Sequence, residues 1–134
     1  MNEAKNSAET TAAPIYQNQV RLVGYIGKQP ERYEGRTVFT VATQSSWKPV
    51  GSEEWKQETE WHRVVAWGKL AAIGAEFVKG DYVSVEGELR SSQYERIIQA
   101  SSGTDATVTI KAWQIRARAM QKLERKKKAL AVNA

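Results

Sequence analysis

Two tryptophans and an arginine share one face of a predicted strand. The segment reads TEWHRVVAWG, and successive side chains of a strand point to opposite faces. Trp61, Arg63 and Trp67 therefore lie on one face, whereas Val64 and Ala66 lie on the other. Indole rings offer flat surfaces for stacking, and a guanidinium either holds a phosphate or stacks on a base. This arrangement is typical of a surface that binds unpaired nucleic acid.

The spacing of the two tryptophans indicates that they serve different nucleotides. At about 3.3 Å per residue, their positions lie roughly 20 Å apart, too far for one base. Two alternatives remain at this stage: both rings are core residues of a sheet, or they form a protein interface. We favour exposed rings, because the opposite face already supplies Val64 and Ala66 to bury.

For other polar and aromatic residues near this strand, the sequence predicts structural roles or none. Trp47 and Trp55 flank a turn, and we expect Trp55 to pack across the hairpin as a cross-strand pair with Trp47. His62 faces away from the tryptophans, so we expect a hydrogen-bonded histidine in the core or at a subunit contact. A nuclease that uses the hairpin carboxylates is a rival function, but no Asp or His stands nearby to complete a metal site. Those carboxylates are Glu53, Glu54, Glu58 and Glu60.

The composition excludes several classes of chemistry. The chain of 134 residues has no cysteine and one histidine, so disulfides, thiolate nucleophiles and sulfur-ligated metals are ruled out and no cofactor is expected. The net charge of +5 is unevenly distributed. Residues 1–110 hold 12 basic and 14 acidic residues, whereas residues 111–134 hold 8 basic residues and 1 acidic residue. Affinity for DNA must therefore come from local placement of cations.

The elements that position these residues form a small all-β domain. Alternating apolar patterns predict five strands, and KLAAIGAEFVKG predicts one helix that ends at a Gly80 cap. Val83, Val85 and Leu89 are expected to point inward, with a bulge at Gly87. A helix between strands three and four of five predicts an OB-fold, a five-stranded Greek-key barrel.

The chain divides into three parts. Residues 1–17 are expected to be a flexible arm, residues 18–118 the barrel, and residues 119–134 a basic tail that is partly helical or disordered. No apolar run is long enough for a membrane span or resembles a secretion signal, which favours a cytoplasmic, nucleoid-associated protein.

Several motifs resemble the bacterial single-stranded DNA-binding protein family. They are QVRLVGYIGKQPE, ATQSSW, ETEWHRVVAWGKL and YVSVEGELRS, and the resemblance extends from about residue 18 to residue 118. It implies an OB-fold that binds single-stranded DNA during replication, recombination or repair and catalyses nothing. A related accessory factor or an RNA-binding module would use the same chemistry.

The resemblance also implies which residues contact DNA. The family's base-stacking positions correspond to Trp47, Trp61, Trp67 and Tyr94. Candidates for phosphate contacts in the matched region are Arg21, Lys28, Arg63, Lys69, Lys79, Arg90 and Arg96.

Assembly and recruitment are the last expectations from the resemblance. Family members usually form homotetramers, here through the first strand. Many end in an acidic tip that recruits replication and repair enzymes, whereas this chain ends AVNA after KLERKKKA, so recruitment through such a tip is not expected. The basic tail either adds affinity for DNA by counterion release or has no function.

Overall fold

The computed structural model describes residues 13–101 and 103–124. Most of the expected flexible arm and most of the expected basic tail lie outside these residues. The described elements are β1 (Val20–Ile26), β2 (Glu31–Tyr33), β3 (Arg36–Trp47), β4 (Lys56–Trp67), α2 (Lys69–Ala75), β5 (Tyr82–Gln99) and β6 (Asp105–Lys122). No helix among them is long and apolar enough to cross a membrane.

The strands form one sheet that closes on itself. Their order is β1-β5-β6-β4-β3-β2, and an additional pairing of β1 with β3 closes the barrel. The pairing of β4 with β6 is parallel, and all other pairings are antiparallel. The closed five-stranded barrel with one helix confirms the predicted OB-fold architecture. The short β2 adds a strand, so α2 follows the fourth strand in chain order rather than the third.

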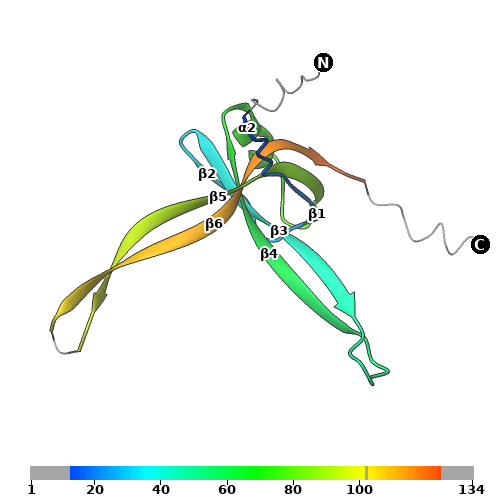
Figure 1. Cartoon of the computed structure of the whole chain (residues 1–134). Coiled ribbons are helices and arrows are strands. Elements are labelled where there is room, and N and C mark those ends of the chain that lie inside the picture. The colour runs from blue at the N-terminus through cyan, green and yellow to red at the C-terminus, as the bar shows by residue number, and fades with distance from the viewer. Residues whose placement is uncertain (1–12, 102, 125–134) are drawn as a thin grey trace, which may run out of the picture.

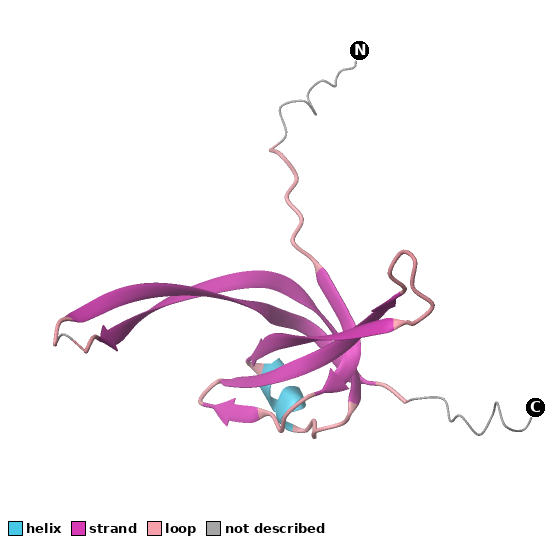
Figure 2. Cartoon of the chain, turned by 90° about the horizontal axis from the view of Figure 1, so that it is seen from below, coloured by secondary structure: helices cyan, strands magenta, loops and turns pink. Residues whose placement is uncertain are grey.

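Two long hairpins extend beyond the barrel (Figure 1). The ends of β3 and β4 form one arm, and β5 with β6 form the other, which is paired from Val83–Lys122 out to Gln99–Asp105. Figure 2 shows both arms leaving the barrel while α2 packs below it. The strands of the arms therefore continue past the core of the barrel, and their outer parts are exposed to solvent.

The core consists of the inward-facing residues of the barrel strands. Alternation along β1 buries Leu22 and Ile26, and the same alternation buries Val83 and Val85 on β5, as predicted for these two valines. Leu89 is the exception: its side chain is 43% exposed, so the prediction that it points inward is wrong. The reason is that β5 leaves the barrel soon after Gly87 and continues as an arm.

Gly87 lies where β5 bends, as predicted. The register of β5 against β6 shifts between Glu86 and Gly87, which is a bulge. A side chain at Gly87 would overlap the Arg116 carbonyl group of β6. The absence of a side chain therefore allows the two backbones to approach closely as the strand turns away from the barrel.

The helix is shorter than its sequence pattern predicts. It ends at Ala75, because the next residues turn back: the Glu76 and Phe77 N–H groups donate to the Ile73 and Gly74 carbonyl oxygens. Phe77 is then buried in the core, where its ring packs edge-on against that of Phe39 with 5.7 Å between the ring centroids. Gly80 is not the helix cap.

The last strand is longer than predicted. Residues up to Lys122 continue β6 rather than starting a helical or disordered tail. Ala117 is buried, Met120 packs against the core, and the Leu123 N–H donates to the Tyr82 carbonyl oxygen at 2.7 Å. Ala117 and Met120 are three positions apart, and both can face the core because the register shift between Glu86 and Gly87 leaves Arg118 as an extra residue on β6.

Candidate nucleic-acid interface

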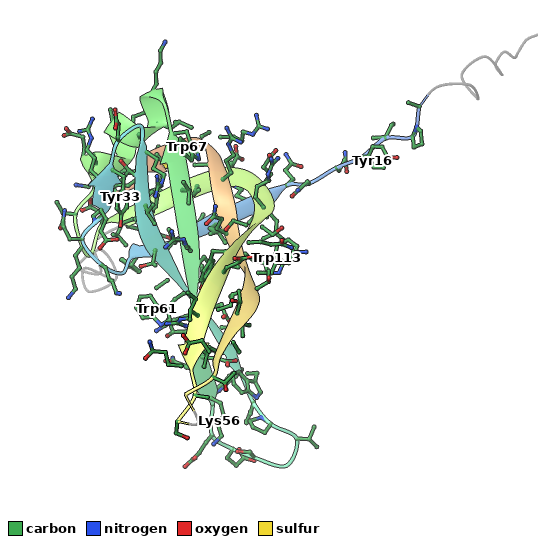
Figure 3. All side chains as sticks on the ribbon, turned by 90° about the vertical axis from the view of Figure 1, so that its left-hand side faces the viewer. Tyr16, Tyr33, Lys56, Trp61, Trp67 and Trp113 are labelled. Atoms are coloured by element: carbon green, nitrogen blue, oxygen red, sulfur yellow. The ribbon has the colours of Figure 1, made fainter. Side chains whose placement is uncertain are left out.

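The outer face of β4 presents two indole rings to solvent. Trp61 is 60% exposed and Trp67 is 45% exposed, whereas Val64 and Ala66 on the opposite face are fully buried. The alternative that both tryptophans are core residues of their own chain is therefore wrong. In Figure 3 the two rings follow one another along β4. Trp61 and Trp67 thus lie exposed on one face of β4, on which Val65 is buried between Arg63 and Trp67, and Val64 and Ala66 are buried on the other face.

The ring of Trp61 packs against Gly27, a residue without a side chain. A Cβ atom at Gly27 would overlap the Trp61 ring, so the indole rests directly over the glycine. A pocket of about 380 Å³ opens beside the ring and is lined partly by Tyr25, Thr59 and Tyr82. One face of the ring is thus supported by the barrel, and more than half of the residue's surface stays exposed to solvent.

Gly27→Ala is expected to displace the Trp61 ring and weaken binding of single-stranded oligonucleotides. The new methyl group would occupy the place of the ring, and a half-exposed ring can swing away with little cost to the core. In a Trp61→Ala background the same substitution should have a much smaller effect on affinity, because only the overlap with Thr40 Oγ1, 2.8 Å from the new methyl group, remains. Fluorescence anisotropy of a labelled oligo-dT, measured for all four variants of this cycle, checks the prediction. Equal losses in both backgrounds would contradict it.

Trp67 lies beside a groove with two arginines. This groove has a volume of about 330 Å³ and is lined by Trp67, Arg90, Ser91, Gln114 and Arg116. It sits where β4 runs parallel to β6, with Val65 opposite Arg116. Such a groove suits a nucleotide, because the base can stack on the exposed indole ring while the arginines neutralise its phosphate.

Arg63 connects the two tryptophan sites on this face. Its Nε donates to the Gln114 Oε1 atom at 3.2 Å, which holds the guanidinium over the junction of β4 and β6. Lys28 lines a shallow pocket together with Arg63 and Thr40. These two expected phosphate contacts therefore lie on the same side of the barrel as Trp61 and Trp67.

The remaining stacking candidates lie on the arms. Tyr94 is half-exposed on β5, four residues from Arg90 and on the same face of that arm. Trp47 is also half-exposed but pairs with Lys56, whereas Trp61 pairs with Ala42. Because five positions separate Ala42 from Trp47, Trp47 lies on the opposite face of the β3–β4 ribbon from Trp61. Tyr94 thus shares a strand face with Arg90, which lines the groove beside Trp67, whereas Trp47 lies on the face of its ribbon opposite to Trp61.

The other expected phosphate contacts are scattered. Arg96 shares the arm face with Tyr94, in register with Val108. Lys69 begins α2, and Lys79 lies in the turn before β5, where its N–H donates to Gln29 Oε1. Arg21 on β1 lies 3.7 Å from the Glu86 carboxylate.

Glu88 neutralises part of the positive charge near Trp67. Its carboxylate contacts the Arg118 and Arg90 guanidinium groups, each at 2.7 Å. The hydrogen bond from Arg118 lowers the pKa of Glu88 most, burial raises it, and the charge of Arg118 and the contact with Arg90 lower it further, so that the pKa stays below its ordinary value. The carboxylate is therefore ionised at neutral pH, and it competes with phosphate for both arginines.

Glu88→Gln is expected to strengthen binding of oligo-dT and to steepen its salt dependence. Freeing one arginine for a phosphate should raise the slope of log K against log salt by about 0.7 for a single strand. Titrations at several salt concentrations measure this slope. Glu53→Gln, which removes the same charge beside Lys48, a cation that is not among the expected phosphate contacts, is the matched control. Weaker binding by Glu88→Gln would show that the carboxylate positions the arginines.

The predicted contacts of His62 and Trp55 can be compared with the structure. His62 Nε2 lies 2.8 Å from Thr43 Oγ1, in agreement with the expected hydrogen bond. Trp55 is 67% exposed, and the only aromatic ring pairs within the described residues are Tyr25–Tyr82 and Phe39–Phe77. The predicted pairing of Trp55 with Trp47 is therefore wrong. No cluster of His, Asp and Glu in this part of the chain could hold a metal ion.

Sequence reasoning missed several residues near these surfaces. Arg116 lines the groove beside Trp67, and Arg36 approaches the same ring from the other side. Trp113 is half-exposed on β6 with the Lys111 ammonium 4.8 Å from its ring centroid. Trp113 pairs with Ser91, so it lies on the other face of the arm from Tyr94. Arg36 and Arg116 come beside Trp67 only through the register between strands, whereas Lys111 and Trp113 are two residues apart on one strand and their shared face could have been found from the sequence.

The sequence matches the single-strand binding protein family over residues 17–117. The chain belongs to this family. The match covers most of the chain and includes every expected site residue. It is a family of binding proteins, so the chain is not an enzyme.

Solved structures support the fold. An SSB of Plasmodium falciparum in complex with ssDNA is 22% identical, with a TM-score of 0.59, over 84% of this chain and 100% of the other. The small single-stranded DNA-binding protein from Streptomyces coelicolor is 21% identical, with a TM-score of 0.54, over 81% of this chain and 95% of the other. At this identity the likeness establishes a shared OB-fold.

Proposed function

We propose that the chain binds single-stranded DNA without regard to sequence. Membership of the single-strand binding protein family supports this function, and the open rings of Trp61 and Trp67 beside cations are the observation that carries it. Each stacked base contributes on the order of 1–3 kcal/mol, whichever base it is, because every base has an aromatic face. Stacking on aromatic rings therefore gives affinity without sequence preference.

The path of the DNA follows from the positions of these side chains. Bases stack on Trp61 and Trp67 along β4 and on Tyr94 along the β5–β6 arm, and Trp47 holds a further base where the strand passes around the β3–β4 arm. Arg63 and Lys28 neutralise phosphates between the tryptophans. The other phosphate contacts proposed are Arg21, Lys69, Lys79, Arg90 and Arg96.

The proposed DNA-binding domain starts at residue 18 and includes the whole of β6. Its role is to protect unpaired DNA during replication, recombination or repair, in the cytoplasm at the nucleoid. Homotetramers would form through β1, whose outer face exposes Val23 and Tyr25 beside Tyr82. Burial of this apolar face between copies would bring several DNA-binding faces into one particle.

A fluorescence titration with poly-dT tests the function. Binding should quench the tryptophan fluorescence, because bases stack on the indole rings, and duplex DNA should fail to compete. Equal affinity for duplex and single strand would overturn the proposal. A competition with oligo-rU separates a preference for DNA from one for RNA, and light scattering on the same samples gives the mass of the assembly.

A further inference from the structure

Three side chains form a row across the outer face of β2, β3 and β4. Tyr33 is in register with Arg36, and Arg36 is in register with Trp67. The Arg36 Cζ atom lies 4.6 Å from the centroid of the Tyr33 ring and 5.7 Å from that of the Trp67 ring. A guanidinium thus lies between two aromatic rings, and Figure 3 shows Tyr33 beside Trp67.

Both rings of this row are open to solvent. Tyr33 and Trp67 are each 45% exposed, and all three residues of β2 are exposed. The Tyr33 hydroxyl donates to Glu31 Oε1 at 3.1 Å, which restrains the ring. Cation–π contacts at exposed sites are weak. The row therefore contributes little to the stability of the barrel, and its aromatic surface stays available to a ligand.

No carboxylate within residues 13–101 and 103–124 forms an ion pair with Arg36. Ion pairs among the described residues hold Arg21, Arg90 and Arg118 against glutamates, but none of them involves Arg36. On the other side of Trp67, Arg116 lines the groove. The ring of Trp67 thus has a cation on each side, and the guanidinium between the two rings is free to take a phosphate.

We propose that Tyr33, Arg36 and Trp67 form a nucleotide subsite that extends the DNA path from β4 onto β2. Trp67 and Tyr33 each stack one base, and Arg36 contacts the phosphate between them. This inference rests on the proposed binding of single-stranded DNA and adds Tyr33 and Arg36 to the residues that perform it. The ligand is an unpaired strand, because the two ring faces of a paired base are already covered by its neighbours.

Substitutions on the β2–β3 hairpin test the subsite with a control on the same element. Arg32 pairs with the buried Thr37, so its exposed side chain lies on the opposite face from Arg36. Arg32→Ala and Arg36→Ala remove the same charge from the same hairpin. The affinity of each variant for a labelled oligo-dT is measured by anisotropy at several salt concentrations, with thermal unfolding as a check on the fold.

The subsite predicts different results for the two arginines. Arg36→Ala should lose about tenfold in affinity, and its slope of log K against log salt should fall by about 0.7, whereas Arg32→Ala should change affinity by less than about twofold. Arg36→Lys should keep the slope, because the charge remains. Tyr33→Ala should lose about fivefold or more with an unchanged slope.

The outcomes separate this inference from the proposed function. Equal behaviour of Arg36→Ala and Arg32→Ala, or full affinity in Tyr33→Ala, would overturn the subsite while the unmodified chain still binds oligo-dT. Failure of the unmodified chain to bind oligo-dT would overturn the proposed function itself. Tyr33→Ala removes an exposed ring, so a loss of affinity at an unchanged melting temperature supports the subsite directly.

Discussion

Replacing Trp61 with alanine is expected to weaken binding of oligo-dT by about 1–3 kcal/mol, because one stacked base loses its partner. The fold should be little affected, since most of the ring is exposed and the fully buried Val64 and Ala66 lie on the other face of β4. Anisotropy of a labelled oligo-dT measures the affinity without depending on tryptophan fluorescence. Thermal unfolding followed by circular dichroism measures the stability.

Trp55→Ala is the matched control for this substitution. Trp55 is also an exposed indole on the β3–β4 hairpin, but it lies in the turn beyond Trp47 and has no proposed contact with DNA. Its removal should leave affinity unchanged. The experiment also tests the protein-interface alternative: if Trp61→Ala altered the mass of the assembly and kept full affinity for DNA, the exposed tryptophans would be protein contacts instead.

Strand periodicity made most of the fold predictable. The alternation of apolar and polar residues identified the barrel strands, and the exposed tryptophans followed from the same period of two. Local patterns predict only which residues lie on the same face of a strand. The burial predicted from them was wrong where β5 leaves the barrel. Leu89 continues the apolar pattern of β5 and pairs with the buried Ile115, yet it is 43% exposed where β5 leaves the barrel.

The ends of elements were less predictable, for a physical reason. The apolar residues after Lys69 are compatible with a longer helix, but burying Phe77 against Phe39 requires the chain to turn after Ala75. Residues near Met120 are good helix formers, yet pairing with β5 satisfies their backbone hydrogen bonds as a strand. In both places contacts between distant segments overrode local preference.

The sequence predicted which residues of the candidate site share a strand, but it did not predict which residues of neighbouring strands lie beside them. Trp61, Arg63 and Trp67 were found together because one strand carries all three. Arg36 and Arg116 lie on different strands, and only the register of β3 and β6 against β4 places them on either side of Trp67. The same register places Trp47 on the opposite face of its ribbon, which its neighbours in sequence could not reveal.

The double variant Trp61→Ala with Trp67→Ala should lose the sum of the two single losses, about 2–6 kcal/mol of binding free energy. The positions lie roughly 20 Å apart along β4, so each ring serves a different base, and substitutions at separated sites are usually additive. Titration of all four proteins at low salt keeps the weakest binding measurable by anisotropy. A double variant no weaker than one of the single variants would mean that the rings act as one unit on the DNA. Additivity would instead support a strand that runs along β4 and meets each indole separately.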